Sequence, residues 1–458
     1  MYMPLRCESS GGHERMTAQN KRLLIAFFLA MNAVGAVPRS PHAQETIDKT
    51  KLEWAHAILR DAHDAVKKYY YDPAYHGLDL EAQYRLYDEK IDSAPSFNEC
   101  LRFVAAFLEG LRDSHTYLIP PDRPYRFDYG FRMQLFGDKA FITRTRPGTD
   151  AETKVHPGDE VLAYQTNPVN RSDFHDVSYL FNNLMPRTNI QLDLRDPDGN
   201  VRRVVVETKV KQGKTERHMT PSSDDYYRLL RESQNEGHIL RQQQQVIGDV
   251  VIWKMPRFVL TPEEVDHLFE NVRKHRTLIL DLRGNPGGES VTLERMLGNL
   301  FDHDVKIAER VGRKDLKPAI AKTIGQHAFA GQLIVIVDSI SASAAELFAR
   351  VIQLEHRGLV LGDRTSGSVM EAEIYRFSQG TEYAQIWYAF FVTEADLIMK
   401  DGKSLERVGV TPDEIVLPTA KDLAAGRDPV LARAAELVSA KLDADAAGKM
   451  FPFEWLPF

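Results

Sequence analysis

Apolar residues recur at helical spacing in two segments near the start of the chain. Residues 48–72 place a stripe of apolar side chains on one face. Residues 96–112 begin with Ser-Phe-Asn-Glu, which has the form of a capping box, and continue with a second apolar stripe. The sequence therefore predicts two helices, with residues 113–116 just beyond the end of the second.

The pattern changes to short strands, separated by turns rich in Gly, Pro, Asn and Asp, between residues 125 and 210. An early Tyr129-Gly130-Phe131-Arg132 loop, a Pro-Gly-Asp turn at 157–159 and a closing hairpin resemble a PDZ domain. Such a domain binds a peptide as an added strand and holds its carboxylate in the N–H groups of the early loop. The resemblance implies a peptide-binding role for Tyr129, Gly130, Phe131 and Arg132, while a plain β-sandwich without a binding function stays open.

Strands and helices alternate from residue 246 onward, which is typical of an α/β core. Residues 277–282 and 333–337 are continuous apolar runs, as expected for strands buried on both faces of a sheet. The first run ends at the turn 283–288, which contains Gly287 and Gly288, and the second leads into the start of a helix. The polar residues 213–245 that precede this region are predicted to form a linker.

A basic pair and an apolar run precede all of these elements. Lys21 and Arg22 are followed by the apolar residues 23–37, a run shorter than the roughly 20 residues that cross a bilayer. This pattern predicts a secretory signal cleaved after Ala43, with Ala36 as a second candidate, and a secreted, periplasmic protein without stable membrane insertion after cleavage. A retained membrane anchor is the alternative.

Composition narrows the possible functions. The net charge is −7, which gives no basic field for phosphate backbones and argues against a nucleic acid partner. The two cysteines, Cys7 and Cys100, exclude a disulfide framework or a cysteine-based zinc site. The chain is divided into a signal peptide (1–43), a helical region (44–122), a PDZ-like domain (123–212), a polar linker (213–245), an α/β core (246–440) and a C-terminal tail (441–458).

Ser343 lies where a buried strand gives way to a helix. The N–H of Ala344 is then an unpaired donor at a helix N-terminus, and Gly287 or Gly288 of the other turn offers a second donor. Two donors of this kind would stabilise the oxyanion formed when a serine attacks a carbonyl group. Taken singly, the serine is more often a helix cap, and the glycine turn is equally suited to cradling a phosphate or forming a tight corner.

Four ordered motifs, taken together, resemble peptidase family S41, the C-terminal processing and tricorn-core serine proteases. They occupy residues 278–288, 341–346, 362–367 and 405–413. The resemblance implies a ClpP/crotonase-like α/β protease core with an N-terminal helical region and an inserted PDZ-like β domain. It also implies that Ser343 is the nucleophile and that Ala344 with Gly287 or Gly288 forms the oxyanion hole.

One departure from the family pattern bears on the mechanism. The processing-protease branch uses a lysine base just past the Thr-x-Gly turn, and this sequence has Ser368 there. The tricorn-like branch instead uses a histidine from the N-terminal region and a glutamate after the core strands. The resemblance to that branch implies His115 as the base, Glu406 as its acidic partner and Ser114 as a fourth member.

These observations together predict a secreted serine endopeptidase of the tail-specific type. Its partners would be protein or peptide substrates, bound through a C-terminal carboxylate, and no metal or organic cofactor is implied. Two alternatives remain: a non-catalytic protein that binds ligands or peptides on the same scaffold, and an acyl-CoA enzyme with a crotonase-type core.

Overall fold

The structure is a computed structural model that describes residues 47–212, 242–381, 384–455 and 458. The described residues form a mixed α/β fold, as the sequence predicts, with two six-stranded sheets, one five-stranded sheet and one two-stranded sheet. The predicted signal peptide and most of the predicted linker lie outside the described residues. The domain boundaries therefore stay predictions.

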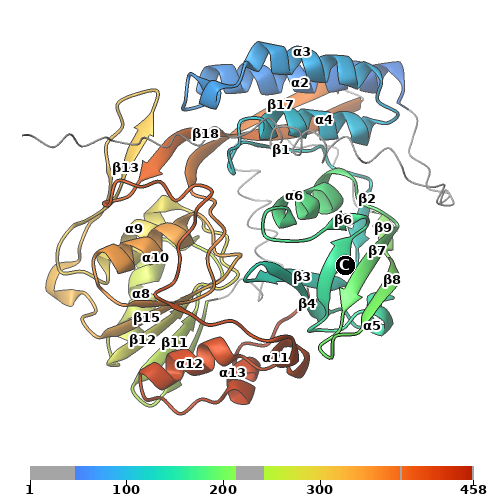
Figure 1. The fold of residues 1–458 in the computed structure, drawn as a ribbon. Helices are drawn as coiled ribbons and strands as arrows, with labels where there is room; N and C mark the ends of the chain where they lie inside the picture. Colours follow the sequence, from blue (N-terminus) through green and yellow to red (C-terminus); the bar gives the residue numbers. More distant parts are fainter. Residues whose placement is uncertain (1–46, 213–241, 382–383, 456–457) are drawn as a thin grey trace, which may run out of the picture. The chain divides into compact units, whose positions relative to one another are not determined.

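The sheet that carries the apolar strands is six-stranded and almost entirely parallel, with only β10 antiparallel to its neighbour. Its strands in spatial order are β10 (Gln243–Ile247), β11 (Val250–Lys254), β12 (Thr277–Asp281), β15 (Gln332–Val337), β16 (Leu359–Gly362) and β19 (Glu414–Ile415). Every residue of β12 is buried, because helices cover both faces of the sheet. One face packs on α8 (Pro262–Val272), α9 (Ser290–Gly298) and α10 (Ala344–Leu354), and the other on α12 (Pro429–Leu437) and α13 (Ala444–Met450), as Figure 1 shows.

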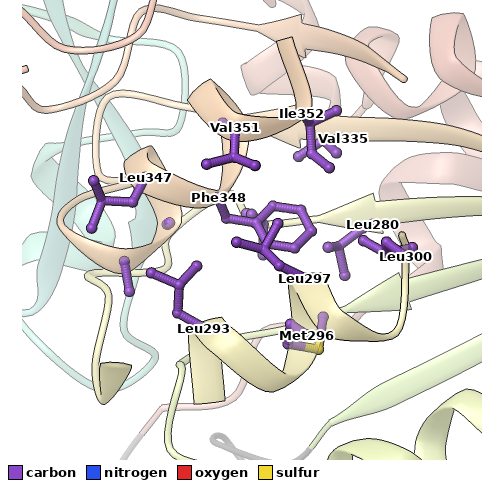
Figure 2. Packing of buried hydrophobic residues seen from close by; sticks show 14 of the residues in the cluster. Leu280, Leu293, Met296, Leu297, Leu300, Val335, Leu347, Phe348, Val351 and Ile352 are labelled. Atoms are coloured by element: carbon purple, nitrogen blue, oxygen red, sulfur yellow. The ribbon is translucent and has the colours of Figure 1, made fainter. Parts of the chain in front are cut away.

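Helix α10 is held against this sheet by its apolar face. Phe348 is fully buried and lies among Leu293 and Leu297 of α9 and Leu280 of β12 (Figure 2). Burying each such side chain stabilises the fold by about 1.5–3 kcal/mol. The start of α10, immediately after Ser343, is therefore fixed relative to the ends of the central strands.

A second sheet joins the N-terminal helices to strands from the C-terminal half. Its members are β1 (Tyr117–Ile119), β13 (Val305–Gly312), β14 (Ala319–Ala321), β17 (Met370–Thr381) and β18 (Ala384–Ile398). Helices α2 (Lys49–Tyr69) and α4 (Phe97–Glu109) share a core with β18. The long β17–β18 pair and helix α3 (Leu80–Asp92) have no counterpart in the sequence prediction.

The two predicted N-terminal helices are present but shorter than expected. The helix predicted to reach Arg112 ends at Glu109, because Gly110 caps it and Arg112 has a positive φ of 56°. Ser96 caps its start, as predicted, by accepting a hydrogen bond from the Glu99 N–H group. The segment that follows this helix leads directly into β1, which pairs with β18.

The region between residues 123 and 212 forms an antiparallel sheet in the order β3-β4-β5-β7-β8, with β6 paired to β5. Its strands are β3 (Phe131–Phe136), β4 (Lys139–Thr145), β5 (Glu160–Tyr164), β6 (Asn167–Pro168), β7 (Asn189–Arg195) and β8 (Val201–Glu207). Short helices α5 (Ala151–Lys154) and α6 (Phe174–Tyr179) accompany it, and β2 (Tyr125–Asp128) pairs with β9 (Lys209–Gln212) beside it. This is the predicted β-rich module; its PDZ-like identity stays a prediction.

Candidate active site

Ser343 occupies a strained turn between β15 and α10. Its φ and ψ of 54° and −118° lie outside the regions that residues with a side chain normally adopt. Its N–H group donates to the main-chain oxygen of Ser368 at 2.8 Å and to the carboxylate of Glu346 at 3.1 Å. The hydroxyl group takes no part in these contacts, so the turn holds the residue by its backbone.

Glu346 is a fully buried carboxylate that holds this turn in place. It also accepts hydrogen bonds from the Thr365 hydroxyl at 2.5 Å, the Gly367 N–H at 2.8 Å and the Ser368 N–H at 2.9 Å. Burial raises the pKa of Glu346 to about 7, against the opposing effect of these donors. The sequence prediction gave Glu346 no role, although its spacing from Ser343 has the Ser-x-x-Glu form of a capping box.

Gly287 packs directly against Ser343. A Cβ atom at Gly287 would lie 2.7 Å from the Ser343 Cβ and 2.8 Å from the Ala342 oxygen, so only glycine fits there. The Gly287 N–H group donates to the Asn285 side-chain oxygen at 2.8 Å. Of the two glycines expected to offer an oxyanion donor, Gly287 therefore has its N–H group already engaged.

The N–H group of Gly288 is placed differently. Phe258 pairs with the flanking residues, because its N–H donates to the Gly287 oxygen and its own oxygen accepts from Glu289. In this pattern the Gly288 N–H points away from Phe258. Among the described residues, neither this group nor the N–H of Ala344 has a hydrogen-bond acceptor. Gly288, next to the Gly287 that packs against Ser343, and Ala344, next to Ser343 in sequence, therefore both carry N–H donors without an acceptor among the described residues.

A buried charge network anchors the glycine turn. Arg283 forms ion pairs with both Asp281 and Asp428, at 2.8 and 2.7 Å, and Lys254 lies 3.2 Å from Asp281. Burial alone would raise the pKa of Asp281, but the charges of Arg283 and Lys254 hold it below its usual range. The Lys254 ammonium also donates to the Arg283 main-chain oxygen, so this lysine is committed to the turn.

His115 reaches the same region through strand β1. Pairing of β1 with β18 sets Tyr117 opposite Phe391, which brings the preceding residues next to Thr393. The carboxylate of Asp113 accepts hydrogen bonds from the His115 N–H at 2.7 Å and from the Thr393 hydroxyl at 2.8 Å. Asp113 thus fixes the backbone of His115; the sequence contains no local signal for this role.

Ser114 connects His115 to Glu406. Its hydroxyl oxygen lies 2.8 Å from His115 Nδ1 and 2.7 Å from Glu406 Oε2, and its N–H donates to Glu406 Oε1 at 2.9 Å. Since the hydroxyl donates to the carboxylate, the imidazole must supply the proton of the other hydrogen bond. This assigns the proton to Nδ1 and leaves a lone pair on Nε2.

The main chain of residues 368–369 links this hydrogen-bonded chain to Ser343. The Ser368 oxygen accepts from the Ser343 N–H, and the Val369 N–H donates to Glu406 Oε2 at 3.0 Å. No hydrogen bond joins Ser343 to His115 in the structure. The structure therefore brings Ser114, His115 and Glu406 into direct contact and attaches Ser343 to them through two adjacent backbone groups.

Burial shifts the pKa values of His115 and Glu406, the two ionisable groups of this hydrogen-bonded chain. Burial lowers the pKa of His115; Asp113 opposes the shift and His175 of α6 adds to it. Burial raises the pKa of Glu406, against hydrogen bonds from Ser114 and Val369. The imidazole is therefore neutral at neutral pH, which is the state that can accept a proton.

The predicted peptide-binding loop is placed only partly toward solvent. Tyr129 is buried and its hydroxyl donates to the Phe181 oxygen at 2.7 Å. The Gly130 N–H donates to the Asp128 carboxylate at 2.9 Å, and Phe131 packs against the core of the sheet. Arg132 alone among the four is exposed. A peptide-binding role for this loop stays a prediction.

Other kinds of site were sought in the described part of the chain. No group of three or more His, Cys, Asp or Glu side chains there is arranged to hold a metal ion. None of the helices described combines the length and apolar character needed to cross a membrane.

A serine at a strained strand-to-helix turn, two backbone donors beside it and a neutral histidine linked to a carboxylate are typical of serine hydrolases. Residues 247–416 match the family model for Peptidase family S41. The α/β core of this chain is therefore similar to the serine-type peptidases of that family. The match includes Ser343 and Glu406 but not His115, which lies N-terminal to it.

Individual relatives show the same similarity. The chain is 32% identical over 177 residues to the chloroplastic C-terminal processing peptidase of Tetradesmus obliquus, covering 38% of this chain and 34% of the relative. It is also 32% identical over 168 residues to Tricorn protease homolog 1 of Streptomyces coelicolor, covering 36% of this chain and 14% of the relative. The chain thus spans about a third or less of these two relatives, and its identity to both is the same over the aligned residues.

The fold is shared over a greater length. The solved structure of mature CPAF complexed with lactacystin superimposes with a TM-score of 0.61 and 14% identity, covering 87% of this chain and 99% of that one. At this identity the likeness concerns the fold alone.

Proposed function

We propose that this protein is a serine endopeptidase that hydrolyses peptide bonds of protein substrates, with Ser343 as nucleophile and His115 as base. The observation that supports this most is the hydrogen-bonded chain from His115 through Ser114 to Glu406, which leaves Nε2 of a neutral imidazole ready to take a proton. Position 368, where a processing protease has its lysine, holds a serine whose backbone oxygen accepts from Ser343 and whose N–H donates to Glu346.

The reaction follows from these contacts. His115 Nε2 removes the hydroxyl proton of Ser343 as the oxygen attacks the carbonyl carbon, and returns that proton to the leaving amine. Through Ser114, Glu406 fixes the tautomer of the neutral imidazole and stabilises the imidazolium that forms when His115 takes the proton. The hydrogen bond from the Ser343 hydroxyl to His115 Nε2 forms when substrate is bound, since catalytic hydrogen bonds commonly tighten only in the substrate complex.

Ala344 and Gly288 supply the oxyanion hole in this proposal. The Ala344 N–H begins α10 next to Ser343, the Gly288 N–H belongs to the turn whose Gly287 packs against Ser343, and neither has an acceptor among the described residues. A donor of this kind contributes about 10²–10³ in rate. Gly287 has a steric role instead, since its N–H is bonded to Asn285.

Incubation with an unfolded protein tests the proposal. Fragments identified by mass spectrometry should accumulate with the unaltered chain and not with Ser343→Ala. Equal cleavage by both proteins, or cleavage by neither, would remove Ser343 from the account. The location of the new ends along the substrate would show whether cleavage is confined to the C-terminal region, as the names of the processing-protease relatives suggest.

The setting of this activity also belongs to the proposal. A secreted, periplasmic enzyme follows from the predicted signal, and recognition of a substrate carboxylate by a PDZ-like insert follows from the resemblance of residues 123–212. The ClpP/crotonase-like form of the core and the histidine-based branch of the family are proposed on the same residues.

The acid limb of the pH profile of kcat/KM should report the protonation of a histidine base. Burial lowers the pKa of His115 below its ordinary 6.5, and a neutral ring is needed, so activity should persist below that pH before it falls. His175→Gln removes a group that lowers this pKa and should move the acid limb upward. A rate that rises only above about pH 8.5 would indicate a lysine base and contradict the proposal.

Gly287→Ala should inactivate the enzyme by displacing Ser343. The new methyl group would lie 2.7 Å from the Ser343 Cβ, which is too close, so the Ser343 side chain would have to move. A misplacement of about 1 Å in a catalytic group costs about 10²-fold in kcat. Gly284→Ala is the matched control, because Gly284 also has a positive φ in the same turn but has open space around its Cβ position. Equal loss of activity in both variants, at equal thermal stability, would contradict the steric role.

A further inference from the structure

Three arginines lie together on the β3–β4 hairpin. Arg132 of β3 is directly opposite Arg144 of β4, and Arg146 lies just beyond the end of β4, where its main-chain N–H continues the pairing by donating to the Gly130 oxygen. Residues that pair across two strands, or that are two apart on one strand, point to the same face of a sheet. We name this surface the arginine face (Arg132, Arg144 and Arg146).

Two aromatic side chains from the far end of the chain cover this face. The guanidinium of Arg146 lies 4.5 Å from the centre of the Trp455 ring, and that of Arg132 lies 5.7 Å from it. The guanidinium of Arg144 lies 5.8 Å from the centre of the Phe453 ring. Phe453 and Trp455, two positions apart, contact each other edge to face with ring centres 5.2 Å apart.

Other contacts support the same placement. The Lys211 ammonium of β9 donates to the main-chain oxygen of Phe458 at 3.2 Å, so residue 458, marked C in Figure 1, also lies at this module. The main-chain N–H of Arg146 donates to the Gly130 oxygen, and Arg132 itself ends the predicted peptide-binding loop, so the arginine face adjoins that loop. Strand β3 is also the edge strand of its sheet, and an edge strand can receive an added chain.

The aromatic segment (residues 451–455) is held by its ring contacts more than by burial. Phe453 keeps 44% of its surface exposed, although it is a large apolar side chain. A guanidinium group over an aromatic face is attractive even where water has access, which accounts for a phenylalanine and a tryptophan lying on charged side chains. An exposed cation–π contact contributes about 0.5–1 kcal/mol, so a few of them hold the segment in place while its release costs little free energy.

We propose that the arginine face is a peptide-binding surface that this chain's own residues 451–455 occupy. The surface takes a segment with two aromatic side chains two positions apart, whose rings stack on the three guanidinium groups. A separate peptide of the same pattern competes with the aromatic segment for this surface. Binding of this kind needs no hydrolysis, so the inference holds or fails independently of the proposed peptidase activity.

The experiment measures binding of a fluorescent peptide with the sequence of residues 451–458 to the full-length protein, by anisotropy, in a Ser343→Ala background. Removing the internal occupant with Phe453→Ala and Trp455→Ala should tighten binding of the probe about tenfold or more. Adding Arg132→Ala and Arg144→Ala to that variant should reverse the gain. A probe with alanine at both aromatic positions should not bind.

The control removes two other arginines of the same sheet, with Arg195→Ala and Arg203→Ala on β7 and β8. It should leave the gain intact, since these side chains pair with Glu160 and Asp193. Probe binding that is the same with and without the internal aromatic residues would overturn the proposal. A loss that is equal in the control and the arginine-face variant would also overturn it, as a general effect of charge.

Discussion

Replacing Ser343 with alanine is expected to lower kcat for peptide hydrolysis by about 10⁴-fold or more, with little change in thermal stability. The activity falls because the nucleophilic oxygen is lost. The fold survives because this residue is held through its N–H group by Ser368 and Glu346, and alanine keeps that N–H group. Cleavage of an unfolded protein and thermal unfolding measure the two effects separately.

Ser366→Ala is the matched control for this variant. Its hydroxyl lies 3.1 Å from that of Ser368 in the turn that Glu346 holds, and its N–H group, which alanine keeps, donates to the Ser341 oxygen. It should keep activity within a fewfold of the unaltered chain. A Ser343→Ala variant with activity close to that of Ser366→Ala would show that another group attacks the substrate.

Replacing His115 with glutamine is expected to lower kcat by a similar factor, about 10⁴. Glutamine cannot take the proton from Ser343. No lysine at position 368 can replace the base, because that residue is a serine. Single-turnover cleavage of a chromogenic peptide ester would show the loss at the acylation step.

His175→Gln is the control for the loss of a histidine near the site. His175 influences the charge state of His115 but belongs to α6, outside the hydrogen-bonded chain. This variant should retain most activity at pH 8, where His115 is neutral in either case. If His115→Gln retained as much activity as His175→Gln, the base would have to be sought elsewhere.

The parts of the site that lie on the parallel sheet could be predicted from local sequence. The apolar runs before Gly284 and Ser343 identify buried parallel strands, and the carboxyl ends of such strands meet at one edge of a sheet. The structure confirms both strands as β12 and β15 and places Gly287 against Ser343. The choice between Gly287 and Gly288 as a donor depended on the side chain of Asn285, which no pattern reveals.

The approach of His115 to this edge could not be predicted from periodicity. It depends on β1 pairing with β18, two strands that are more than two hundred and fifty residues apart in the sequence. Local patterns carry no information on such pairing. The β17–β18 pair was missed altogether, and so was helix α3, because only Leu80 and Ile91 of that helix are buried and its apolar stripe is weak.

The roles of Ser114 and Glu346 show what family resemblance and spacing each contribute. Resemblance alone pointed to Ser114, and the structure places its hydroxyl between His115 and Glu406. The spacing of Glu346 from Ser343 predicts a capping box, but it does not predict contacts with residues outside the helix, so the sequence prediction assigned Glu346 no role in the site. Its contacts with Thr365 and Gly367 depend on tertiary packing.

The most direct measurement of the central claim is the rate at which a fluorophosphonate reacts with the protein, followed by intact mass and mapped by peptide sequencing. The phosphorus forms a bond to the serine oxygen as fluoride leaves, so the rate reports how strongly that oxygen is activated. The account predicts a single label on Ser343 and a rate at least about 10²-fold lower in His115→Gln. Labelling at another residue, or the same rate in both proteins, would contradict it.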